Sequence, residues 1–132
     1  MIEANDVYLE KAQESLDGAE SEFINRRYNN AANRCYYATF QAAISALSQA
    51  NILPPTADDE WSHKFVQAQF VGQLINRRKV YPSSLRNILA ENYKLRETAD
   101  YKRDRVTEVR ASRAVSRTEA FLAAIREGGR RQ

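Results

Sequence analysis

The segment from Arg26 to Leu47 constrains the fold most, because its apolar residues cover more than one face of a helix. The segment reads RRYNNAANRCYYATFQAAISAL and contains neither Gly nor Pro. One set of residues recurs at helical spacing: Tyr28, Ala32, Cys35, Tyr36, Thr39, Ala43 and Leu47. A second set, Tyr37, Phe40 and Ile44, overlaps the first. A helix that is apolar nearly all round must be covered nearly all round, so we expect a central helix whose paired tyrosines serve packing.

The rest of the chain reads as helices separated by short breaks. Apolar residues at helical spacing precede and follow the central segment, and prolines at positions 54, 55 and 82 interrupt the pattern. Short connections between helices favour antiparallel neighbours. We therefore predict one all-α domain over residues 1–132, an up-and-down bundle of four to five helices. Their expected positions are about 6–27, 30–51, 62–78, 83–101 and 107–127.

Capping residues mark the expected helix ends. We predict N-caps at Asn5 or Asp6, at Ser62 and at Thr107. The asparagines at positions 29 and 30 are expected to turn the chain and to cap the central helix. The glycine pair at positions 128 and 129 predicts the stop of the last helix.

Positive charge is concentrated in the second half of the chain. Residues 1–76 hold 5 Lys and Arg against 10 Asp and Glu, whereas residues 77–132 hold 15 against 7. The basic half is either a surface for an anionic partner or a solvated, arginine-rich set of helix faces. Without an apolar signal segment or membrane span, and with Cys35 alone, the sequence favours a cytoplasmic protein with an inert buried thiol.

The residue types exclude several kinds of site. A di-iron site in a bundle needs two Glu-x-x-His motifs, and His63 is the single histidine. On a helix the neighbouring Ser62 would lie about 100° away from His63, too far round to share a proton with it easily. No GxxxxGK or GxGxxG phosphate loop is present. We expect neither metal nor cofactor, and we interpret His63 as a structural or surface residue in the first turn of its helix.

A polar constellation closes the fourth predicted helix. Arg96 and Asp100 are four residues apart, so they are neighbours on the helix surface and can pair. Tyr101 follows at the helix end, with Lys102 and Arg103 in the charged connection after it. The segment thus gathers guanidinium, phenol and ammonium groups in one place.

Three motifs occur in order along the chain. The central helix contains Ala-x-x-x-x-Tyr-Tyr-Ala-x-Phe, Ser-His-Lys at 62–64 opens a later helix, and Arg-Glu-Thr-Ala-Asp-Tyr at 96–101 closes the next. In this order and spacing, over most of residues 5 to 127, the chain resembles the HEPN superfamily of small helical bundles. The resemblance implies a four- to five-helix bundle, commonly a homodimer. It also implies a minimal nucleotidyltransferase as partner, as in many prokaryotic toxin–antitoxin pairs.

The resemblance also raises the question of ribonuclease activity. Many HEPN proteins are metal-independent ribonucleases with an Arg followed by four to six residues and a His. In them the arginine stabilises charge on the scissile phosphate, and the histidine moves the proton of the attacking 2′-hydroxyl. No histidine follows Arg96 in this chain, and Asp100 lies where one would be expected. A carboxylate beside an arginine is a weak base, so we interpret Asp100 as an orienting partner.

Two further groups of residues bear on binding. Arg110, Arg113 and Arg117 lie on one stripe of the last helix, which either follows a phosphate backbone or is simply solvated. From the family's tendency to line its pocket from two helices, Asn33 is expected to face Arg96 across the bundle.

Our leading hypothesis is RNA or nucleotide binding through Arg96, Asp100 and Tyr101, with the adjacent Lys102 and Arg103. The alternatives are a ribonuclease toxin with an altered acid or base and a non-catalytic protein-interaction module.

Overall fold

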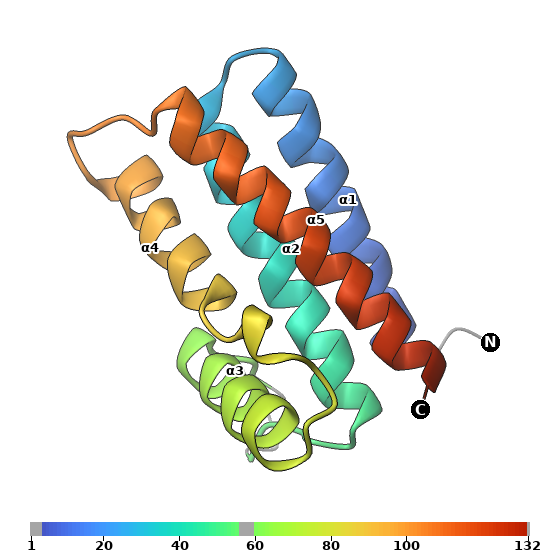
Figure 1. Cartoon of the computed structure of the whole chain (residues 1–132). Helices are drawn as coiled ribbons and strands as arrows, with labels where there is room; N and C mark the ends of the chain where they lie inside the picture. The colour runs from blue at the N-terminus through green and yellow to red at the C-terminus, as the bar shows by residue number, and fades with distance from the viewer. Residues whose placement is uncertain (1–3, 56–59, 132) are drawn as a thin grey trace.

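The chain folds into a helical bundle, and the expected all-α class is confirmed. A computed structural model describes residues 4–55 and 60–131, and these residues contain no strand. Figure 1 shows α1, α2 and α5 side by side, α4 alongside them, and α3 packed at one end of the bundle. The elements are α1 (Ala4–Ile24), α2 (Tyr28–Gln49), α3 (His63–Gln69), the π-helical η1 (Phe70–Arg77), the 3-10 turn η2 (Ser83–Leu85), α4 (Ile88–Tyr101) and α5 (Glu108–Arg131).

The helix α2 lies at the centre, as its sequence predicts. It packs against α1, α3, η1, α4 and α5. Tyr36, Ile44 and Leu47 on it are buried, and so are most of its alanines. Tyr37 is the exception among its large apolar residues, since 40% of its surface is exposed. The prediction that both paired tyrosines serve packing is therefore wrong for Tyr37.

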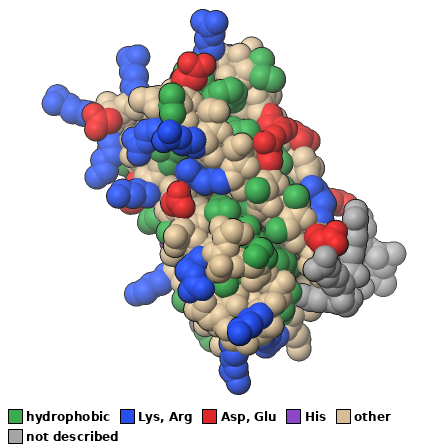
Figure 2. All heavy atoms as spheres, in the orientation of Figure 1, with side chains coloured by type: hydrophobic (Ala, Val, Ile, Leu, Met, Phe, Trp, Pro, Cys, Tyr) green, Lys and Arg blue, Asp and Glu red, His purple; other side chains and the backbone are tan. Residues whose placement is uncertain are grey.

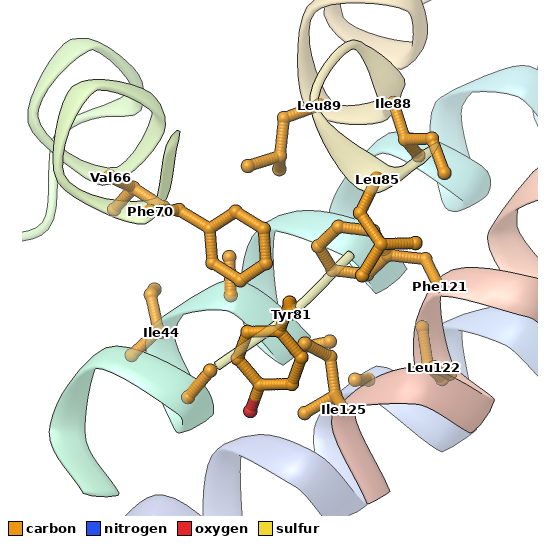
Figure 3. Packing of buried hydrophobic residues seen from close by; sticks show 14 of the residues in the cluster. Ile44, Val66, Phe70, Tyr81, Leu85, Ile88, Leu89, Phe121, Leu122 and Ile125 are labelled. Carbon is orange, nitrogen blue, oxygen red and sulfur yellow. The ribbon is translucent and has the colours of Figure 1, made fainter. Parts of the chain in front are cut away.

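Two apolar clusters fill the bundle. The larger one lies where α2 and α5 meet η1, η2 and the start of α4, with the Phe70 ring 5.4 Å from Tyr81 and 5.2 Å from Phe121 (Figure 3). The smaller one lies at the other end and includes Cys35 and Leu95. Cys35 is fully buried, and burial raises the pKa of its thiol to about 11, so it is the inert thiol that the sequence predicts.

A buried polar layer lies between the two clusters along the helices. At its centre Asn92 of α4 donates to Thr118 Oγ1 at 2.9 Å and to Thr39 Oγ1 at 3.3 Å. The same amide nitrogen lies 3.3 Å from the carbonyl oxygen of Cys35. Asn92 Oδ1 accepts a hydrogen bond from Arg117 Nε at 2.7 Å. Since a buried amide must find partners, this layer fixes the register of α2, α4 and α5.

The helix ends agree with the sequence at two caps. Ser62 Oγ accepts from Phe65 N at 3.1 Å, and Thr107 Oγ1 accepts from Arg110 N at 3.2 Å. The predicted caps of the first two helices are wrong. The helix α1 begins at Ala4, so positions 5 and 6 lie within it, and the N-cap residue of α2 is Arg27. The side chain of Asn29 accepts from the backbone of the α4–α5 connection.

The predicted stop at Gly128 and Gly129 is also wrong, because α5 continues to Arg131. A Cβ atom at Gly128 would come within 2.9 Å of Cζ and Oη of Tyr81. Glycine therefore stands at this position to let the tyrosine ring approach the helix, and not to end the helix.

The third and fourth helices are less regular than predicted. The expected helix over 62–78 changes from α to π geometry at Phe70, and the expected helix over 83–101 is a 3-10 turn followed by α4 from Ile88. The π geometry is rare, and a periodicity argument based on 3.6 residues per turn does not detect it. No helix within the described ranges is long and apolar enough to cross a membrane.

Candidate functional site

Arg96 of α4 lies at the centre of a cluster of tyrosines, which we call the arginine cage. Its guanidinium carbon lies 4.8 Å from the ring centre of Tyr36, 5.7 Å from Tyr37, 5.8 Å from Tyr93 and 5.9 Å from Tyr101. Two of the rings come from α2 and two from α4. Such distances allow the ring faces to attract the cation. The sequence predicts Tyr101 close to Arg96 at the helix end, but the prediction does not single out Tyr93, Tyr36 or Tyr37 as neighbours of Arg96.

Asp100 and Asn33 complete the polar side of the cage. Asp100 Oδ2 lies 3.6 Å from Arg96 Nε, one turn along α4, and accepts a hydrogen bond from Asn33 Nδ2 at 2.9 Å. The predicted position of Asn33, across the bundle from Arg96, is thereby confirmed. Asp100 is thus held between the two side chains. Its role in binding, like that of Asn33, stays a prediction.

Arg96 has one nitrogen with unmet hydrogen-bonding capacity. Its Nη1 donates to Tyr37 Oη at 3.3 Å, but its Nε is buried and has no hydrogen-bond partner among the described residues. A buried N–H group without a partner is costly, and a guanidinium carries its charge at all physiological pH values. The cage therefore holds a cation whose hydrogen bonds are incomplete.

His63 joins the same cluster from the first turn of α3. Its ring stacks on Tyr93 with 3.8 Å between ring centres, and its Nδ1 shares a hydrogen bond with Tyr36 Oη at 3.3 Å. Burial lowers the pKa of His63, and the Arg96 charge lowers it further, while Gln67 and Glu97 act in the opposite direction. The imidazole is therefore neutral at neutral pH. The place of His63 in the first turn of its helix is as predicted, and its packing on Tyr93 agrees with a structural role. Its position beside the Arg96 cluster could not be predicted from spacing, since 33 residues of chain separate it from Arg96.

Tyr36 links the histidine to the arginine without acting as a base. Burial raises the pKa of its phenol to about 12, although the charge of Arg96 opposes the increase. The phenol therefore keeps its proton at neutral pH. It can donate or accept a hydrogen bond, but it does not supply a negative charge.

Of the remaining predicted residues, Tyr101 lies at the edge of the cage and the others lie outside it. Lys102 and Arg103 are exposed in the connection between α4 and α5. Arg110, Arg113 and Arg117 line a groove on the α5 side of α4. Tyr101 is 71% exposed and forms the outer edge of the cage.

The donor set suits an anion more than a metal ion. The cage offers guanidinium N–H groups, phenol hydroxyls, the Asn33 amide and a neutral imidazole, beside two exposed aromatic rings. Among the described residues no group of three or more His, Cys, Asp or Glu side chains could hold a metal ion. Exposed rings next to a guanidinium are typical of sites for phosphates that carry a base.

Comparison with known proteins gives two matches. Residues 6–128 match the model of the HEPN domain. Over 119 residues the chain is 31% identical to a protein of Methanocaldococcus jannaschii that bears the name "putative toxin". The match covers 90% of this chain and 84% of the relative.

Proposed function

The chain belongs to the HEPN domain family, and on that premise we propose that it binds RNA or a nucleotide through the arginine cage. We propose further that it does so as the toxin-like member of a prokaryotic toxin–antitoxin system in the cytoplasm. The relative's name supports the toxin setting, and the cage supports the ligand.

The observation that carries the proposal is the Arg96 guanidinium, whose side chain keeps 17% of its surface exposed and whose Nη1 donates to the neutral hydroxyl of Tyr37. A phosphate oxygen can accept from a guanidinium and from the Tyr37 hydroxyl beside it, and charge-assisted hydrogen bonds of this kind are stronger than neutral ones. The exposed faces of Tyr37 and Tyr101 offer stacking surfaces for a base. The cage thus matches both parts of a nucleotide.

In this proposal the Asp100 carboxylate competes with an incoming phosphate for Arg96. The carboxylate lies 3.6 Å from Arg96 Nε, so an incoming phosphate has to compete with it or accept from the other guanidinium nitrogens. Asn33 holds the carboxylate at 2.9 Å and keeps it on one side of Arg96. We therefore expect Asp100→Asn to tighten binding of a phosphate and Arg96→Ala to abolish it.

The test is a binding measurement at two salt concentrations with a fluorescent single-stranded oligoribonucleotide and with mononucleotides. Wild type, Arg96→Ala and the control Arg86→Ala are compared, since Arg86 is an exposed arginine of the turn before α4. Circular dichroism verifies that each variant is folded. Loss of affinity in Arg96→Ala alone supports the proposal. No detectable binding by the wild type in low salt would sink it.

A homodimer and a small nucleotidyltransferase partner belong to the same proposal. The family resemblance supports both. Light scattering after size-exclusion chromatography measures the dimer, and co-purification with the product of the adjacent gene measures the partner. A tight complex that resists RNase and the Arg96 substitution would favour the protein-interaction module instead.

A metal-independent ribonuclease is a second candidate, and the specific observation in its favour is His63. A neutral imidazole in the cluster around Arg96 can accept the 2′-hydroxyl proton of RNA while the guanidinium stabilises the phosphorane charge. The 2′-oxygen would bond to phosphorus, the bond to the 5′-oxygen would break, and that oxygen would take up a proton. The products are a 2′,3′-cyclic phosphate and a 5′-hydroxyl.

Cleavage of assorted RNAs by wild type, His63→Gln and Arg96→Ala separates this candidate from simple binding. Cyclic phosphate formed by the wild type but not by His63→Gln supports it. Intact RNA, together with normal growth of cells that express the protein, dismisses it.

A further inference from the structure

A groove between α4 and α5 collects cations that the arginine cage does not use. It has a volume of about 290 Å³ and lies on the flank of α4 opposite the cage. Figure 2 shows Lys and Arg side chains gathered over this part of the molecule. The lining residues are Glu91, Lys94 and Leu95 of α4 and Arg110, Arg113 and Arg117 of α5. Four cations therefore face one carboxylate.

The single carboxylate in the groove is already engaged. Glu91 Oε2 lies 3.6 Å from Arg117 Nη1, and Arg117 Nε donates to the buried Asn92. The side chains of Lys94, Arg110 and Arg113 form no hydrogen bond or ion pair within the part of the chain that the structure describes. Three cations thus remain without a counter-charge in a concave surface.

Arg117 lines the groove with a side chain that is held in place by its neighbours. Its side chain is only 21% exposed, and its Nε and Nη1 are held by Asn92 and Glu91. Burial lowers the pKa of Arg117, Glu91 raises it, and repulsion from Arg110 lowers it again. Arg117 is therefore partly desolvated, with Glu91 as its counter-charge and Arg110 as a like charge nearby. An anion in the groove would supply a further counter-charge to this cation and to Arg110.

The shape of the lining favours a phosphate backbone over a whole nucleotide. No aromatic side chain lines the groove, so a base finds no ring on which to stack. Long, mobile lysine and arginine side chains around an anchored arginine are suited to phosphates in a sequence-independent way.

The groove and the cage share one turn of α4. Leu95 is buried, so Lys94 and Arg96 leave the helix about 100° to either side of it. A chain of phosphates that crosses the exposed face of α4 can reach both residues. The exposed Lys102, Arg103 and Arg105 extend the positive surface beyond the end of the helix.

We propose that the groove between α4 and α5 binds the phosphodiester backbone of a single-stranded RNA whose neighbouring nucleotide occupies the arginine cage. This inference rests on the proposed RNA-binding function. The groove supplies affinity that depends on salt and not on sequence, whereas the cage selects a nucleotide.

The test measures the affinity of a fluorescent single-stranded oligouridylate as a function of salt. The groove variant is Arg110→Gln with Arg113→Gln, and the control is Arg77→Gln with Arg86→Gln, which removes the same charge from exposed arginines that do not line the groove. Losing two phosphate contacts lowers the slope of log affinity against log salt by about 1.4, since each contact to a single strand contributes about 0.7. The control leaves the slope unchanged. Glu91→Gln, which removes the only carboxylate, tightens binding, and this gain guards against variants that merely fail to fold.

The outcomes separate the groove from the cage. A smaller slope in the groove variant alone supports the inference. Equal slopes in wild type, groove variant and control, with weaker binding only in Arg96→Ala, overturn the groove and leave the proposed function in place. Weaker binding in the groove variant but not in Arg96→Ala keeps the groove and overturns the cage. An inorganic tripolyphosphate that competes as well as the oligouridylate does would show a general polyanion site and would overturn the assignment to RNA.

Discussion

The buried amide of Asn92 is predicted to be one of the most costly side chains to remove. It is fully buried, its nitrogen contacts Thr118, Thr39 and the Cys35 carbonyl, and its oxygen accepts from Arg117 Nε at 2.7 Å. Asn92→Ala deletes all four contacts at once. The polar partners of Asn92 then remain between two apolar clusters without their hydrogen bonds to it.

The magnitude follows from which partners are left unsatisfied. Thr118 still donates to Ala114 O, and Thr39 still donates within its own helix. The loss of the hydrogen bond to each threonine therefore lowers the free energy of unfolding by only about 0.5 to 1 kcal/mol. Arg117 Nε loses its acceptor while it is largely buried, and a hydrogen bond to a charged group contributes about 1.5 to 3 kcal/mol. With the small cavity added, we expect Asn92→Ala to lower the free energy of unfolding by about 3 to 6 kcal/mol.

The assay is urea unfolding followed by circular dichroism, in a double-mutant cycle with Arg117→Met. Removing the arginine removes the charge that lost its acceptor. Asn92→Ala should therefore cost about 1.5 to 3 kcal/mol less in the Arg117→Met background. Asn76→Ala, at an exposed asparagine, serves as the control and should cost little. A loss below about 1 kcal/mol in Asn92→Ala, or an equal loss in both backgrounds, would refute the reasoning.

Three further substitutions test the packing and the charges. Gly18→Ala should stabilise the protein by about 0.5 to 1 kcal/mol, because the added Cβ meets only a movable arginine side chain. Gly128→Ala should destabilise it by about 1 to 3 kcal/mol, because the added Cβ meets the Tyr81 ring. Thermal unfolding measures both effects. The neighbouring Glu119 carboxylate and burial raise the pKa of Glu20 to about 7. The folded protein therefore keeps a proton that the unfolded chain releases near pH 4.5. As a result, the stability of the protein falls as the pH rises between these two values. Glu119→Gln should flatten this decline and raise the melting temperature at pH 8; an unchanged pH profile would contradict the pairing.

Much of the fold follows from the sequence because local rules act alone there. The two-sided apolar pattern of α2 identifies the central helix, and Ser62 and Thr107 cap the helices they were expected to cap. Local rules fail where contact with a residue distant in the sequence determines the local structure. Gly128 reads as a helix stop, but the Tyr81 ring 47 residues earlier is the reason for the glycine. The π turn at Phe70 likewise leaves no trace in a pattern of 3.6 residues per turn.

The contacts of the candidate site are likewise of two kinds: those within one helix, which spacing predicts, and those between helices, which it does not. Arg96 and Asp100 share a helix face, so their pairing could be predicted from a spacing of four residues. Tyr37 and His63 come from other helices, and their contacts with the cage depend on how those helices pack. An aromatic residue on a central helix also reads as core, because burial is the commoner fate of such residues. Only the packing distinguishes the buried Tyr36 from the exposed Tyr37.

The buried thiol of Cys35 makes this protein convenient for spectroscopy. The chain has one cysteine, fully buried, and its raised pKa keeps the thiolate scarce at neutral pH. Maleimides and spin labels should therefore leave the native chain unmodified. A cysteine introduced by R113C or Y101C would be the one reactive thiol, so a dye or nitroxide could be attached at the groove or at the cage without first removing a native residue. Distances between two such labels in a mixed sample would then report directly on whether two copies associate.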